Sequence, residues 1–147
     1  MGTLLDTTVF IHIERSIRQV REMAVLDEVF RRLTRELSDA EEVGISAVTA
    51  SELLHGVHRA TPEHRPRREA FVELILAAFP PLPFDLLAAR AHARLWAGLA
   101  AAGADVGAHD RIVAATAIAN GWRVATANLR HFDHIPGLDV VLIDLTG

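Results

Sequence analysis

The sequence predicts an α/β domain with a central, mostly parallel sheet of four to five strands flanked by helices. Two observations favour this class: short apolar runs alternate with longer helical patterns, and half of the residues are hydrophobic. A length of 147 residues, with no internal repeat and no domain-scale linker, predicts one domain over residues 1–147.

The amino-terminal part predicts a strand followed by two helices. Residues 3–5 are short and apolar and lead into Asp6, which is typical of a buried strand that ends there. Residues 8–14 then predict a short helix. Residues 17–37 predict a longer one, because apolar side chains recur at helical spacing between arginines and acids.

A second strand and its helix are expected at residues 41–48 and 49–57. The helix opens with Thr49-x-x-Glu52, which matches a capping box. Residues 60–69 are polar and contain two prolines, so they predict a connection, and residues 71–78 predict an amphipathic helix.

The second half of the chain continues the alternation. Residues 80–85 predict a short third strand, and their prolines favour the edge of the sheet. Residues 86–102 predict an alanine-rich helix, and residues 110–120 another that ends at Gly121. The last two strands are expected at residues 122–126 and 139–143.

Composition narrows the chemistry that the chain can perform. The absence of cysteine excludes disulfides, thiolate metal sites and a cysteine nucleophile. The formal net charge is −4, and every basic side chain other than histidine is arginine, because the sequence contains no lysine. No secretory signal pattern or apolar run of transmembrane length is present, so no membrane association and a cytoplasmic location are expected.

Polar residues are expected to converge at one edge of the sheet. Ligands bind beyond the carboxyl ends of parallel strands, where Asp6 and Asn128 follow strands and Glu52 and Asp110 lie near helix starts. Each acid alone also fits a structural role as a helix cap. Together, the carboxylates would repel one another unless they take up protons or hold a cation. Oxygen ligands favour Mg²⁺, with Mn²⁺ as the alternative.

Four sequence blocks, in order, resemble the PIN domain family, and more narrowly its VapC-type toxins. The blocks are LLDTTVFI (4–11), SAVTASELLHG (46–56), HDRIVAATAIANG (109–121) and VATANLRHFDHIPGL (124–138). The resemblance covers nearly the whole chain, although residues 61–103 match only in general character. It implies a PIN-like three-layer fold and a Mg²⁺-dependent endoribonuclease that a cognate VapB-like antitoxin holds inactive.

The resemblance also implies roles for individual residues. Asp6 and Asp110 would be the core metal ligands, and Glu52 would bind the metal or orient a metal-bound water. Thr7 and Thr126 would be hydroxyl partners of the carboxylates. Asn128 stands where the family often has a fourth acid, and this departure leaves open whether one metal or two are held.

RNA must be drawn to an acidic site by cations around it. The candidates are Arg59, Arg65, Arg67, Arg68, Arg111 and Arg130. A solvated surface is the alternative explanation of the first four. Family members commonly form homodimers, so the resemblance implies one here.

Other functions compete with the nuclease. An inactive PIN-like module that binds RNA or protein is one of them. A haloacid-dehalogenase-like phosphatase also ends its first strand on aspartate, but it needs an acid where Thr8 stands and a lysine. A metal-free ribonuclease could use two histidines as acid and base, and the pairs His55/His58 and His131/His134 are candidates.

Overall fold

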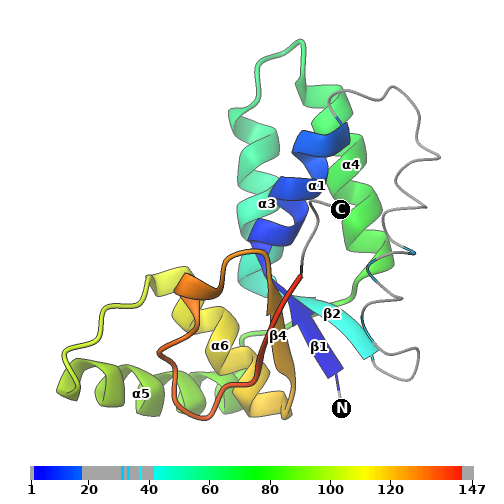
Figure 1. Ribbon diagram of the computed structural model, residues 1–147. Helices are drawn as coiled ribbons and strands as arrows, with labels where there is room; N and C mark the ends of the chain where they lie inside the picture. The colour runs from blue at the N-terminus through cyan, green and yellow to red at the C-terminus, as the bar shows by residue number, and fades with distance from the viewer. Residues whose placement is uncertain (1, 18–30, 32, 34–36, 38–41, 144–147) are drawn as a thin grey trace.

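The computed structural model describes residues 2–17, 31, 33, 37 and 42–143 (Figure 1). The predicted α/β class is confirmed: five strands form one sheet in the order β3-β2-β1-β4-β5, and every neighbouring pair is parallel. The strands are β1 (Gly2–Leu5), β2 (Glu42–Ser46), β3 (Pro81–Leu82), β4 (Arg123–Thr126) and β5 (Val140–Leu142). The helices are α1 (Thr7–Ile17), α3 (Ala47–Arg59), α4 (Arg65–Ala78), α5 (Leu86–Ala101), α6 (Ala108–Asn120) and the 3₁₀ turn η1 (Leu129–His131).

The order of the strands reverses at β1, the central strand. The chain passes from β1 to β2 and β3 on one side, and β4 and β5 lie on the other. Leu5 pairs with Ala125, and the backbone N–H of Asp6 extends this ladder by donating to the Ala125 carbonyl at 2.9 Å. The carboxyl ends of β1 and β4 therefore meet at the reversal point, where parallel sheets bind ligands.

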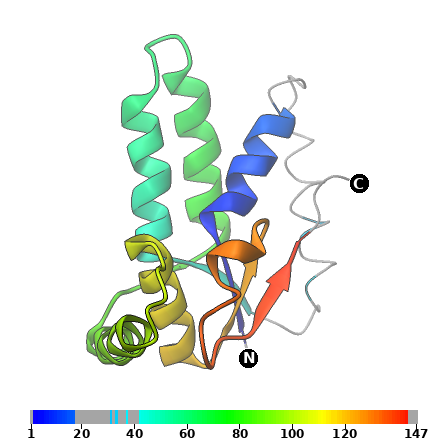
Figure 2. The same ribbon diagram turned by 60° about the vertical axis from the view of Figure 1, so that its left-hand side comes forward.

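Two separate apolar cores hold the helices against the sheet. The alternation of side chains along a strand sends Leu5 and Ala125 to one face and Leu4 and Val124 to the other. The first face packs against α1, α3 and α4, and the second against α5 and α6. Figures 1 and 2 show these two groups of helices on opposite sides of the strands. The molecule thus has the three layers that the sequence predicted.

Several element boundaries differ from those predicted. Helix α3 begins at Ala47, because Ser46 ends β2 and caps the helix by accepting a hydrogen bond from the Val48 N–H at 3.2 Å. The predicted capping box at Thr49 is therefore wrong. Helix α4 begins at Arg65 within the predicted connection, since proline is well accommodated in the first helical turn.

Most of the other predicted elements are confirmed within a few residues. β3 lies at the sheet edge, and Gly121 ends α6 with a φ of 68°. Most of the helix predicted at residues 17–37 lies outside the described residues, although Leu33 and Leu37 are buried in the first core. In the described part of the chain, no helix is long and apolar enough to cross a membrane.

Candidate active site

Asp6 lies at the point where the strand order reverses. It follows β1, its residue is only 3% exposed, and its carboxylate accepts hydrogen bonds from two hydroxyl groups. Thr8 Oγ1 donates to Asp6 Oδ2 at 2.7 Å, and Thr126 Oγ1, from the end of β4, donates to the same oxygen at 3.0 Å. Burying a carboxylate is costly unless its charge is compensated, and two neutral hydroxyls compensate it only in part.

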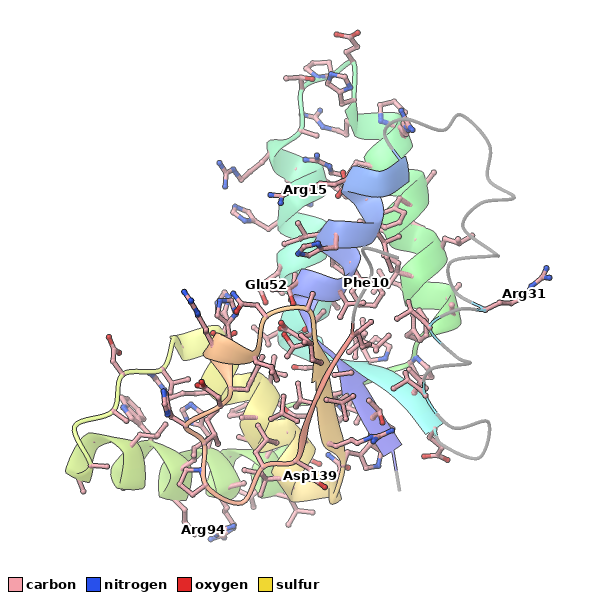
Figure 3. All side chains as sticks on the ribbon, in the orientation of Figure 1. Phe10, Arg15, Arg31, Glu52, Arg94 and Asp139 are labelled. Atoms are coloured by element: carbon pink, nitrogen blue, oxygen red, sulfur yellow. The ribbon has the colours of Figure 1, made fainter. Side chains whose placement is uncertain are left out.

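Glu52 reaches the same region from α3. Thr7, the first residue of α1, donates from Oγ1 to Glu52 Oε1 at 2.9 Å. Figure 3 shows Glu52 on α3, beside α1. The other carboxylate oxygen, Oε2, lies 3.5 Å from His109 Nδ1. Glu52 is thus tied to another helix and has no part in capping its own, because Ser46 is the cap.

Asp110 completes the set from α6. It lies inside the first helical turn, and Gly107 occupies the N-cap position, so the interpretation of Asp110 as an ordinary N-cap is wrong. Burial raises the pKa of the Asp110 carboxyl group, and the negative charges of Asp6 and Glu52 raise it further. His131 and His109 act in the opposite direction.

The negative charges of Asp6 and Glu52 therefore both act on Asp110, although the three carboxylates come from three separate elements. We call Asp6, Glu52 and Asp110 the acidic site. Repulsion among them makes the site a place where a bound cation would be stabilising.

Asn128, the candidate for a fourth position, uses both ends of its side chain within its own turn. Oδ1 accepts a hydrogen bond from the Arg130 N–H at 3.2 Å and caps η1. Nδ2 lies 3.2 Å from His131 Nε2. Thr126 Oγ1 accepts a hydrogen bond from the Asn128 N–H at 3.0 Å, which links this turn to the hydroxyl beside Asp6.

Several of the six candidate arginines contact other parts of the protein. Arg65 donates to the Ala60 carbonyl at 2.9 Å, and Arg68 forms an ion pair with Glu14 at 2.8 Å. Arg111 donates to the Val106 carbonyl at 2.6 Å, and its guanidinium lies 5.0 Å from the centre of the Trp96 ring. The remaining three candidates are exposed: Arg59, Arg67 and Arg130.

Sequence reasoning did not place four residues of this region beside the three carboxylates. Thr8 bonds Asp6, buried Thr49 lies 3.3 Å from Thr7 Oγ1, His109 faces Glu52, and His131 Nδ1 lies 3.7 Å from Asp110 Oδ2. Thr8 and His109 directly neighbour Thr7 and Asp110 in the sequence, which was a signal for both. The contact of His131 depends on how η1 folds back over α6, and no local pattern indicates that.

The donor set of the acidic site suits a hard divalent cation, because carboxylate and hydroxyl oxygens are the ligands that Mg²⁺ and Mn²⁺ prefer. Among the described residues, no three histidine, aspartate or glutamate side chains are grouped tightly enough to hold one ion. Mg²⁺ commonly keeps several waters and takes one or two carboxylates together with substrate phosphate. The residues therefore fit an open site that water and substrate complete.

Known proteins share both the sequence and the fold of this chain. The family model described as PIN domain matches residues 3–138. The Ribonuclease VapC1 of Rickettsia felis is 31% identical over 97% of each chain. The tRNA(fMet)-specific endonuclease VapC of Salmonella typhimurium is 36% identical over 65% of this chain and 71% of its own.

Solved structures of VapBC complexes contain chains with the same fold as this one. A chain of the DNA-bound VapBC complex from Salmonella typhimurium has a TM-score of 0.77 at 27% identity and covers 97% of this chain and 98% of its own. A chain of VapBC2 from Rickettsia felis, bound to promoter DNA, has a TM-score of 0.81 over 98% and 100% of the two chains. At 22% identity, this second likeness shows the fold alone. The family match and the relatives together show that the chain belongs to the PIN domain family, among its VapC members.

Proposed function

We propose that this chain is a divalent-metal-dependent endoribonuclease and the toxin of a type II toxin–antitoxin pair. The observation that carries the proposal is the convergence of Asp6, Glu52 and Asp110, from three elements, at the reversal point of the sheet. The printed names of the VapC relatives, which are ribonucleases, support the substrate class. Mg²⁺ is the proposed ion, with Mn²⁺ as the alternative.

In this proposal each acid has a separate task. Asp6 and Asp110 hold the cation, and the hydroxyls of Thr8 and Thr126 keep the Asp6 carboxylate from rotating. A divalent cation held by these residues would lower the pKa of a coordinated water to near neutral and would offset negative charge on the phosphate. Glu52, fixed by Thr7, orients the attacking water or helps to hold the cation.

Substrate approach depends on charge outside the acidic site. The acids repel a phosphate backbone, so cationic side chains must offset this repulsion. Arg130 is exposed and adjoins the acidic site in the turn that Asn128 caps, which makes it the first candidate for a phosphate contact. Arg59 and Arg67 lie farther away along the α3–α4 pair, where only a longer RNA would reach them. Arg65, Arg68 and Arg111 are assigned to structural contacts.

The partners follow from the same family membership. Several solved relatives are VapBC complexes, so we propose that a VapB-like antitoxin binds this chain. A basic side chain of the antitoxin could neutralise the acidic site in place of the cation. A homodimer, which the resemblance implies, remains part of the proposal.

The proposal is tested by cleavage of purified RNA, with mapping of the new ends. Wild type should cleave with Mg²⁺ and stop with EDTA. It should leave 5′-phosphate and 3′-hydroxyl ends, because water attacks the phosphorus and the 3′ oxygen leaves. Asp6→Asn should lower the rate about 100-fold or more, since a metal supplies several kcal/mol of transition-state stabilisation.

Asp133→Asn is the matched control. Asp133 is exposed, lies in the same carboxyl-terminal region as η1 and pairs with His134 at 3.3 Å. The Asp133→Asn variant should therefore cleave RNA at the same rate as wild type. Equal rates for wild type and Asp6→Asn would overturn the mechanism. Activity that survives EDTA would favour the histidine mechanism, and a chain that binds RNA without cleaving it would favour the inactive module.

A further inference from the structure

The side chain of Asn128 has a fixed orientation. The Arg130 backbone N–H can only donate, so the Asn128 atom that it meets at 3.2 Å must be the amide oxygen. The amide nitrogen, which can only donate, is then directed at His131 Nε2, also at 3.2 Å. A flipped amide would place its NH₂ group against the Arg130 N–H and leave two donors facing each other.

This orientation selects one form of the His131 ring. Because Asn128 Nδ2 donates, His131 Nε2 must accept and carries no hydrogen in the neutral ring. The hydrogen then resides on Nδ1, since a neutral imidazole has one donor and one acceptor nitrogen. The contacts of Asn128 therefore set the tautomer of its neighbour.

The selected hydrogen is directed toward the acidic site. His131 Nδ1 is buried and has no hydrogen-bond partner among the described residues. The Oδ2 atom of Asp110 lies 3.7 Å away, which is beyond hydrogen-bond length but within range of attraction between the N–H dipole and the carboxylate charge. A buried donor without a partner is costly, so an approach of the Asp110 carboxylate to this N–H is favourable.

We propose that Asn128 and His131 form a positioning pair for Asp110, and that Asn128 is not a metal ligand. Asn128 holds the ring in its Nδ1–H form, and the ring attracts Oδ2 of Asp110, so that Oδ1 would remain available to a cation. The catalytic consequence of this pair rests on the proposed nuclease function, whereas the tautomer itself does not.

The pair explains why an amide can stand where an acid is common in the family. A carboxylate at position 128 could still accept from the Arg130 N–H, but it could not donate to His131 Nε2. The neutral ring would then carry its hydrogen on Nε2 and turn a lone pair toward Asp110. An acid at this position is therefore incompatible with the role that we assign to His131.

The first test reads the tautomer directly, with long-range ¹H–¹⁵N NMR of the histidine rings in metal-free protein at a pH where they are neutral. Wild-type His131 should show the Nδ1–H pattern, and the nearly isosteric Asn128→Asp should shift it to Nε2–H. An Nε2–H pattern in wild type, or no change in Asn128→Asp, would overturn the pair. This result is independent of RNA cleavage, so a chain without nuclease activity could still confirm it.

The second test measures Mn²⁺ affinity together with kcat and KM for RNA. His131→Phe removes both nitrogens and should weaken Mn²⁺ binding and lower kcat about tenfold, as loss of a residue that orients a metal ligand does. His131→Asn keeps an N–H at the Nδ1 position and should recover most of both values. His134→Phe, at an exposed position three residues away, should match wild type. Equal Mn²⁺ affinities for His131→Phe and His134→Phe would overturn the positioning role.

Discussion

At the scale of single residues, the acidic site is defined by charges that the protein does not fully neutralise. Asp6 accepts two hydrogen bonds from hydroxyl groups, and Glu52 accepts one. The negative charges of Asp6 and Glu52 both raise the pKa of Asp110. Such an arrangement lowers the stability of the fold, because the repulsion is relieved only when a cation or a proton is present.

Asp110→Asn should therefore stabilise the metal-free protein near neutral pH. The folded state raises the pKa of Asp110, so its ionised form destabilises the fold, and this penalty grows as the pH rises through the raised pKa. The penalty is absent below the ordinary pKa of aspartate. Thermal melts with EDTA should show the variant melting above wild type at pH 8, with a difference that shrinks toward acid pH. A variant that melts below wild type at pH 8 would contradict this explanation.

At the scale of elements, α3 links the stability of the fold to the site. Ser46 ends β2 and caps α3, and the same helix carries Glu52 six residues after this cap. The sequence predicted a helix here, but it placed the cap at Thr49, because Thr-x-x-Glu matches a capping box as well as it matches this site. Which hydroxyl caps the helix depends on where β2 stops pairing with β1 and β3, and that is a tertiary property.

Ser46→Ala should cost about 1 kcal/mol in the free energy of unfolding, the usual value for loss of a cap, and should also lower RNA cleavage. Asp85→Ala is the matched control, since Asp85 caps α5 by accepting from the Ala88 N–H at 3.0 Å and lies outside the acidic site. Urea denaturation should give similar losses for both variants, with full activity only for Asp85→Ala. Equal RNA cleavage by the two variants would show that the cap of α3 does not affect the placement of Glu52.

At the scale of the whole molecule, the sheet depends on a close approach between β2 and its neighbours. A Cβ added to Gly44 would lie 3.0 Å from the Pro80 carbonyl oxygen and 3.3 Å from the Trp122 ring. Trp122 precedes β4, and a Cβ added to Gly2 would also contact its ring. The Trp122 ring therefore packs against both Gly2 in β1 and Gly44 in β2.

Gly44→Ala should destabilise the protein by about 1–3 kcal/mol, as overpacking of a tight interior does. Gly98→Ala is the control: nothing lies within 4 Å of its added Cβ in α5, and alanine there should stabilise by about 0.5–1 kcal/mol. Denaturation midpoints give both values. A gain in stability from Gly44→Ala would show that β2 and Trp122 are not tightly packed.

The fold class and the parallel sheet could be predicted, because they depend on the alternation of apolar runs and helical patterns. The central place of β1 was not predicted, since strand order is fixed by pairing between distant segments. The rule that ligands bind beyond the carboxyl ends of parallel strands led us to expect Asp6, Glu52 and Asp110 near one edge of the sheet. Thr8 and His109 adjoin predicted site residues in the sequence, but the contact of His131 with Asp110 could not be predicted, since it forms only after the elements pack. The i, i+3 spacing of His131 and His134 does not bring the two rings to one site, because His131 faces Asp110 while His134 is exposed.

The central claim is that the acidic site holds a divalent cation, and a Mn²⁺ titration followed by electron paramagnetic resonance tests it most directly. Wild type should remove the signal of free Mn²⁺ with a saturable affinity. Asp6→Asn and Asp110→Asn should bind at least about tenfold more weakly, which corresponds to a loss of about 1.4 kcal/mol, while Asp133→Asn binds like wild type. Equal binding by all four proteins would contradict the account.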